Sequence, residues 1–299
     1  MRLVETVIDL PLASGEVLPG ARCVAAVWGA LNDARDNLVL YPTRFGGTHE
    51  QNAFLIGSVR ALDPAQFCIV MPNMLGNGVS SSPSHLADGK GGLSFPHVTH
   101  ADNIALQDAL LAEHFAGAEI ALAVGWSMGA QQACRWAVTQ PHRVKRLAMI
   151  CGTARTTGHN RVFLESLLAA LQADPRYGTD TAPLGGLRAV GRIYAGWAYS
   201  QAYVTSALYQ EMGFETLDDW LTGYWDALFE ARHAGDLTAM LCTWIAHDVA
   251  DGGDLAQALG QITATTAVAT ASTDLYFTPR DCAAHATLIP GATYQTLET

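Results

Sequence analysis

The chain has 299 residues, 49% of them hydrophobic and 15% charged, so it is long and apolar enough to fold around a sizeable core. Its 28 Asp and Glu outnumber its 17 Lys and Arg, which gives a formal net charge of −11. This balance argues against nucleic acid or an anionic membrane as a partner, because both bind basic surfaces, and it favours a small-molecule role.

The chain shows no pattern typical of a targeting segment, a membrane helix or a metal site. No basic stretch precedes an early apolar run, and no run of about 18 uncharged apolar residues occurs, so we expect a cytoplasmic protein. The ten histidines form no His-Glu-x-x-His motif, and the six cysteines occur singly. We therefore expect reduced cysteines, no metal and no bound cofactor.

Strand-like runs alternate with helical stretches along the first half of the chain and near its end. Residues 3–10 and 21–28 are expected to form an antiparallel pair at one sheet edge, joined through the turn-rich residues 13–20. Further strand-like runs follow at 37–41, 67–71, 120–125, 146–151 and 266–271. This alternation predicts an α/β fold with a mostly parallel central sheet and helices on both faces.

A long helical interval separates the last two of these strands. Helical periodicity is present at 161–171, 187–208 and 217–231, and the interval is too long for a simple crossover. We predict a core domain of residues 1–152 and 262–299, with residues 153–261 inserted as a helical lid that could also mediate a homodimer. The lid is rich in aromatic residues, which could line a pocket or form ordinary core: Tyr194, Trp197, Tyr199, Tyr203, Trp220, Tyr224 and Trp225.

The sequence Gly125-Trp-Ser-Met-Gly129 joins a buried strand to a helix predicted for residues 128–139, which Pro141 ends. Glycines two residues to either side of a serine are typical of a nucleophile elbow, a sharp turn that projects the serine hydroxyl from the sheet. We predict that Ser127 is the nucleophile and that the N–H of Met128 stabilises an oxyanion. The alternative is an ordinary serine in a strand-to-helix connection.

A serine nucleophile requires a base, an acid that orients the base, and a second oxyanion donor. Asp274 follows the strand-like run 266–271 and is the expected acid, although a turn or capping aspartate has the same pattern. The loop after residue 41 is expected to supply the second donor, with the N–H of Arg44 preferred and that of Thr43 next. Further pocket candidates are Thr43, Trp126, Arg155, His159, Trp197 and His247.

Several segments together resemble the homoserine O-acetyltransferase-like branch of the α/β-hydrolases. They are residues 37–50 (NLVLYPTRFGGTHE), 71–78 (MPNMLGNG), 125–129 (GWSMG), 151–160 (CGTARTTGHN), 253–260 (GDLAQALG) and 272–277 (STDLYF). The resemblance implies an α/β-hydrolase fold, a Ser127 nucleophile, an Asp274 acid and a ping-pong reaction through an acyl-serine. It also implies either transfer from acyl-CoA to an alcohol or hydrolysis of an ester.

Two departures from this family limit what can be transferred to the chain. Trp126 stands where the homoserine enzymes usually have glycine, so the acceptor need not be homoserine. In the family, the histidine follows a segment like residues 289–294 by roughly ten residues, in a Gly-His pair, and no such pair follows residue 294 in the 299 residues. His285 falls in a predicted helix, 279–287, on the outside of the sheet. His159 and His247 could enter the site from the lid, but a structural role is the simpler interpretation for each. The base is therefore expected beyond residue 299, or it has been lost.

We predict a serine acyl-transfer enzyme, either an O-acyltransferase or a short-chain carboxylic ester hydrolase. Its partners would be a small-molecule ester, an acyl donor or an alcohol acceptor, with acyl-CoA as a candidate co-substrate. An acyl-CoA site would need basic residues near its mouth, and the lid offers Arg155, Arg161, Arg188 and Arg192. If the base is lost, the alternative is a non-hydrolytic protein that binds a small ligand or catalyses a cyclisation or rearrangement.

Overall fold

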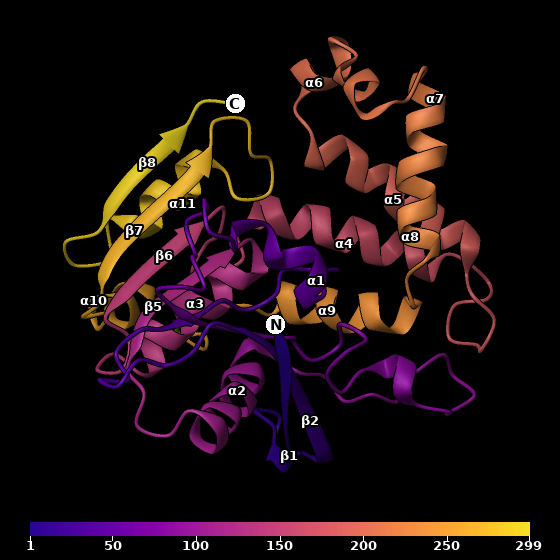
Figure 1. Ribbon diagram of the computed structural model, residues 1–299. Helices are drawn as coiled ribbons and strands as arrows, with labels where there is room; N and C mark the ends of the chain where they lie inside the picture. The colour runs from indigo at the N-terminus through magenta and orange to yellow at the C-terminus, as the bar shows by residue number, and fades with distance from the viewer.

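The computed structural model describes residues 1–299 and contains one eight-stranded sheet in the order β1-β2-β4-β3-β5-β6-β7-β8 (Figure 1). β1 pairs antiparallel with β2 and β2 with β4, whereas all the other pairs are parallel. The strands are β1 (Arg2–Pro11), β2 (Val17–Trp28), β3 (Leu38–Leu40), β4 (Cys68–Pro72), β5 (Ile120–Trp126), β6 (Arg146–Ile150), β7 (Thr265–Ala271) and β8 (Thr293–Leu297).

The alternating side chains of the central strands build two apolar layers, one on each face of the sheet. In β3, Leu38 and Leu40 belong to the main core, whereas Val39 packs in a smaller cluster with Ile69 and Met71 of β4. Both faces of β3 and β4 are thus buried, which explains their continuous apolar sequences. Helices α2, α3 and α11 pack against the sheet.

The helices divide into a set that belongs to the sheet domain and a set inserted between β6 and β7. The first set is α1 (His49–Asn52), α2 (His100–His114), α3 (Met128–Thr139) and α11 (Pro279–Ala286). The inserted set is α4 (Gly158–Gln172), α5 (Leu184–Ala198), α6 (Gln201–Thr205), α7 (Leu217–Trp220), α8 (Ala227–Glu230), α9 (Ala234–Ile245) and α10 (Leu255–Gly260). None of these helices combines the length and the apolar composition that crossing a membrane requires.

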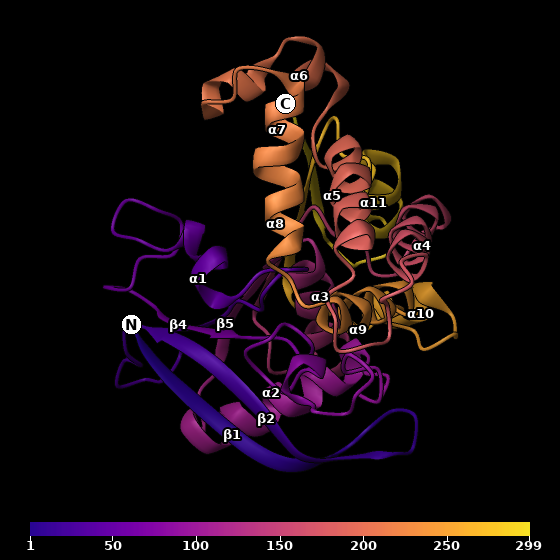
Figure 2. The same cartoon turned by 90° about the vertical axis from the view of Figure 1, so that its right-hand side faces the viewer.

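In both views α5 to α8 rise from the sheet on one side of the molecule (Figures 1 and 2). The helix predicted for 187–208 is broken, since α5 ends at Ala198 and α6 begins at Gln201. The Ser200 hydroxyl causes this restart because it accepts a hydrogen bond from the N–H of Tyr203 and so caps α6.

The helix predicted for 217–231 is continuous but not uniform. α7 runs into a π-helical segment, Leu221–Asp226, and then into α8 without leaving helical backbone angles. π-Helical turns are rare and frequently occur at functional sites.

Candidate active site

The nucleophile elbow is formed where β5 gives way to α3. Trp126 is the last residue of β5 and pairs with Ile150, and Met128 is the first residue of α3. Ser127 lies between them with φ 57° and ψ −126°, a conformation that is strained for any residue other than glycine. Its N–H donates to the Ile150 carbonyl at 2.9 Å, which fixes the turn to the neighbouring strand.

Glycines flank the elbow because there is no room for a side chain. A Cβ on Gly125 would lie 2.1 Å from the carbonyl carbon and oxygen of Gly129. A Cβ on Gly129 would lie 2.5 Å from the Pro42 carbonyl oxygen. Real Cβ atoms do not approach backbone this closely, so both positions require glycine and hold the elbow against the loop after β3.

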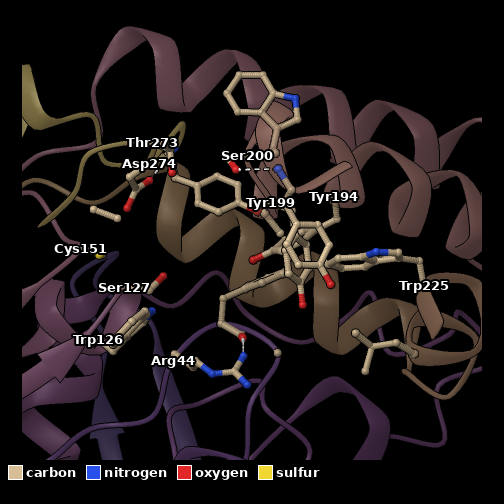
Figure 3. Close-up of a pocket in the computed structure, with 18 of the residues that line it drawn as sticks. Arg44, Trp126, Ser127, Cys151, Tyr194, Tyr199, Ser200, Trp225, Thr273 and Asp274 are labelled. Atoms are coloured by element: carbon tan, nitrogen blue, oxygen red, sulfur yellow. Dashed lines mark hydrogen bonds between the residues drawn. The ribbon is translucent and has the colours of Figure 1, made fainter. Parts of the chain in front are cut away.

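Ser127 opens into a cavity of about 930 Å³ between the sheet and the lid helices. Figure 3 shows the serine hydroxyl pointing into this cavity, with Asp274 above it, Arg44 below it and Trp225 at the far end. Most of the wall is apolar and aromatic, and its aromatic residues are Phe45, Trp126, Tyr194, Trp197, Tyr199, Tyr203, Tyr224, Trp225, Phe229, Tyr276 and Phe277.

Asp274 lies in the turn after β7 and lines the same cavity. One of its carboxylate oxygens accepts hydrogen bonds from the N–H groups of Tyr276 and Phe277, both at 2.9 Å. Burial raises the pKa of this carboxyl, and these two N–H groups oppose the rise. Cys151 lines the cavity beside it, and burial raises the pKa of its thiol to about 12, so the thiol stays neutral.

The two loop residues expected to supply an oxyanion donor differ in their surroundings. The N–H of Thr43 already donates to the Pro72 carbonyl at 3.2 Å, and its hydroxyl accepts from the N–H of Met74 at 3.1 Å. Thr43 is fully buried and does not line the cavity. Arg44 does line it, and Met128, as the first residue of α3, has an N–H without an acceptor in its own helix.

The other predicted pocket residues are divided between the cavity wall and positions away from it, at the surface or in the interior. Trp126 and Trp197 line the cavity. His159 lies behind Trp197, with ring centroids 5.0 Å apart, and does not line the cavity. Arg155 pairs with Asp248 at 2.9 Å, also away from the cavity.

His247 is buried outside the cavity, where Nε2 donates to the Thr153 carbonyl at 3.1 Å. Its ring contacts His100 edge-on, with centroids 4.8 Å apart. His285 in α11 accepts from the N–H of Ala154 at 3.1 Å and likewise lies outside. No histidine of the 299 residues lines the cavity.

The end of the described chain reaches the cavity rim. Thr299 follows β8 and lines the cavity, and its hydroxyl lies 2.8 Å from that of Thr273. Its N–H donates to the hydroxyl of Ser272 at 3.1 Å. These contacts place Thr299 next to the turn that carries Asp274.

Sequence reasoning missed several residues of the cavity wall. Cys151 and Thr273 follow the carboxyl ends of β6 and β7, where ligands collect in sheets of this kind, so strand position could have indicated them. Gln51 and Arg232 come from a short helix and from the turn after α8, and no local pattern marks either residue.

Comparison with known proteins places this geometry in a family. Residues 37–191, more than half of the chain, match the model of the alpha/beta hydrolase fold family. An ethyl acetate hydrolase from Pseudomonas veronii is 37% identical over 96% of this chain and 85% of its own length. A homoserine O-acetyltransferase from Thermobifida fusca is 31% identical over 97% of this chain and 85% of its own length.

A solved structure shares the whole architecture. The acetylester hydrolase from Corynebacterium glutamicum superposes with a TM-score of 0.94 at 35% sequence identity, covering 100% of this chain and 88% of that one. The resemblance on the motifs from residue 37 to residue 277 is therefore confirmed, and so is the predicted fold. The chain belongs to the α/β-hydrolase family, in the group that contains esterases and homoserine O-acetyltransferases.

Proposed function

We propose that this protein hydrolyses small carboxylic esters through an acyl-enzyme intermediate on Ser127. The observation that carries the proposal is the strained elbow, which directs the Ser127 hydroxyl into a cavity that Asp274 also lines. The ethyl acetate hydrolase and the acetylester hydrolase among its relatives support ester hydrolysis.

In this proposal, Ser127 Oγ attacks the ester carbonyl as its proton passes to a base. The carbonyl oxygen becomes negatively charged and is stabilised by the N–H groups of Met128 and Arg44. Collapse of the tetrahedral intermediate expels the alcohol, which takes the proton from the base. Water then attacks the acyl-serine by the same route, and the carboxylic acid product is released.

Asp274 is proposed to orient the base, which would be an imidazole. No histidine is among the residues that line the cavity, so these residues do not supply it. The chemistry of the reaction supports this role, because an imidazole both accepts the serine proton and is oriented by a carboxylate. Added imidazole should replace this group in the 299-residue chain. We therefore expect added imidazole to accelerate acylation of Ser127.

The decisive experiment is intact-mass analysis of the 299-residue protein with p-nitrophenyl acetate, with and without imidazole. A mass increase of one acetyl group, absent in Ser127→Ala, is the expected result. Even without a complete triad, an oxyanion hole retains about 10³-fold to 10⁴-fold catalysis over water, so slow acylation is measurable. If there is no adduct under either condition, the acyl-serine is excluded and the non-hydrolytic alternative is favoured.

A second candidate is an O-acyltransferase that uses acyl-CoA, favoured by the cavity volume of about 930 Å³, which leaves room for an alcohol acceptor beside the acyl group. Both reactions share the acyl-serine and differ in whether water or an alcohol reaches it. Acetyl-CoA consumption that requires an added alcohol would identify the transferase. Consumption of acetyl esters at the same rate with and without alcohol would identify the hydrolase.

We further propose a homodimer formed through the lid in a cytoplasmic protein. The observation behind the dimer is a group of exposed apolar side chains between α6 and the start of α7, namely Leu208, Met212 and Leu217. Light scattering after gel filtration tests this proposal, and Met212→Glu should shift the mass from dimer to monomer. A wild-type monomer at micromolar concentration would contradict it, and subcellular fractionation tests the location.

A further inference from the structure

Two arginines line the cavity without an acidic partner. Arg44 lies in the loop after β3, and Arg232 follows α8 in the lid. Each guanidinium has only one hydrogen bond to the protein: Arg44 donates to the Phe45 carbonyl at 3.2 Å, and Arg232 to Gln51 Oε1 at 3.4 Å. Asp274 is the one acidic side chain among the residues that line the cavity.

Four of the five lid arginines outside the cavity are paired. Arg155, Arg161, Arg188 and Arg192 each form an ion pair, with Asp248, Glu165, Glu230 and Asp226 respectively. Acidic residues outnumber basic ones in this chain by 28 to 17, so partners are plentiful. Arg44 and Arg232 lack such a partner although both are half-buried in the cavity wall. The other arginines without an ion pair are all exposed, namely Arg2, Arg35, Arg60, Arg146, Arg176 and Arg280.

Both arginine side chains are partly buried. Burial lowers the pKa of Arg232, and the positive charge of Arg44 lowers it further, so the two guanidinium groups share one electrostatic environment. The Arg44 side chain folds back over Gly47, where an added Cβ would lie 3.2 Å from its Cγ and 3.5 Å from its Cζ. Partly desolvated charges are normally paired, so these two favour an anion that arrives with a ligand.

The two arginines belong to one wall, opposite Asp274. The ring of Phe45, next to Arg44, stacks on Tyr194 with centroids 6.0 Å apart. Tyr194 in turn contacts Phe229, which is three residues before Arg232, at 5.4 Å. Figure 3 shows Arg44 on the side of Ser127 that faces away from Asp274.

We propose that Arg44 and Arg232 form a carboxylate-binding subsite, so that the substrate is an ester that also carries a free carboxylate. This rests on the proposed ester hydrolysis and names its substrate class. A guanidinium binds a carboxylate through two parallel hydrogen bonds, and two guanidinium groups can hold both of its oxygens. The carboxylate would anchor the substrate on this wall while its ester carbonyl reaches Ser127.

The kinetic test compares esters that differ only in charge. In the acyl arm, the p-nitrophenyl ester of succinate with a free carboxylate is compared with that of monomethyl succinate. In the alcohol arm, the acetyl ester of 4-hydroxybutyrate is compared with that of its methyl ester. All assays contain the same imidazole concentration. We expect the wild type to prefer the anionic ester in one arm, by about tenfold in kcat/KM.

Arg232→Gln should reduce this anionic-to-neutral ratio about tenfold, because it removes a charge-assisted contact. Arg188→Gln is the matched control, since Arg188 is a lid arginine paired with Glu230 outside the cavity, and it should leave the ratio unchanged. Equal ratios in wild type and Arg232→Gln, with the neutral esters cleaved, would overturn the subsite and leave ester hydrolysis standing.

A binding measurement tests the subsite independently of catalysis. Calorimetric titration of the Ser127→Ala variant with glutarate should show binding, and the affinity should fall about tenfold in the double variant that also carries Arg232→Gln. Circular dichroism of each variant checks its fold. Absence of glutarate binding, or binding of inorganic phosphate in its place, overturns the carboxylate assignment. Absence of acyl-enzyme with glutarate binding intact would instead contradict the proposed hydrolysis.

Discussion

Replacing Gly125 by alanine tests whether the elbow geometry, and not merely the presence of a serine, determines reactivity. The new Cβ would lie 2.1 Å from the Gly129 carbonyl carbon and oxygen and 2.3 Å from the N of Ala130, whereas ordinary contacts begin at 3.4 Å. All three atoms are backbone, so no side-chain rotation relieves the clash. The first turn of α3 must move away from β5 by about 1 Å.

This displacement has two measurable consequences. Overpacking against backbone should lower the free energy of unfolding by about 3 kcal/mol. The Met128 N–H moves with the turn, and a misplacement of about 1 Å typically costs about 100-fold in rate. Urea denaturation measures the first effect, and the rate of Ser127 acylation by p-nitrophenyl acetate under native conditions measures the second.

Gly260→Ala is the matched control, since a Cβ at the end of α10 would have nothing within 4 Å. It should leave the acylation rate unchanged and raise the free energy of unfolding by about 0.5 to 1 kcal/mol. If Gly125→Ala folds with wild-type stability and is acylated at the wild-type rate, the close approach of β5 and α3 does not determine the site, and our reasoning is refuted.

Three further predictions concern stability. Burial lowers the pKa of His100 to about 4 and that of its neighbour His247 well below 6.5, so both side chains are neutral in the folded protein. Below pH 6.5 the unfolded chain therefore binds more protons than the folded one. Urea titrations should show the free energy of unfolding falling by up to about 1.4 kcal/mol per histidine per pH unit between pH 6.5 and 4. Equal stability at pH 5 and pH 7 would contradict this. Arg135→Met removes a buried guanidinium that donates to residues 248–251 of the lid, and it should lower the free energy of unfolding by about 2 to 3 kcal/mol. Arg161→Met, at an exposed arginine, should change it by less than about 0.5 kcal/mol. Equal losses in the two variants would contradict a role for burial. Asn160→Leu replaces a buried amide that has no hydrogen-bond partner, so the free energy of unfolding should stay within about 1 kcal/mol of the wild-type value or rise. A larger loss in urea denaturation would show that the amide has a partner.

The sheet could be predicted largely because its strands have sharp apolar boundaries. β5 and the start of α3 were located to within a residue, since the run from Ile120 ends at a glycine-flanked serine. β8 was missed because its residues alternate between partial and full exposure and contain only two apolar side chains, Tyr294 and Leu297. Such an edge strand is defined by its pairing with β7, which the sequence does not reveal.

The cavity wall was harder to predict than the elbow. Ser127 and Asp274 lie at strand ends, and strand ends can be recognised. His159 and His247 could have entered the site because the lid covers it, but neither lines the cavity. His159 is exposed and packs against Trp197, and His247 is buried with a hydrogen bond to the Thr153 carbonyl. Which residues of a helix face a cavity depends on how the lid docks, and helical periodicity alone does not specify that docking.

The π-helical segment of the lid suggests how this cavity could change during evolution. One residue advances an α-helix by about 100°, so deleting a single residue from Leu221–Asp226 would rotate everything after it relative to Trp220. Phe229 and Arg232 would then leave the cavity wall, while the sheet, the elbow and Asp274 would be untouched. A single-codon insertion or deletion at this point could therefore change the shape of the cavity in relatives that keep the same elbow.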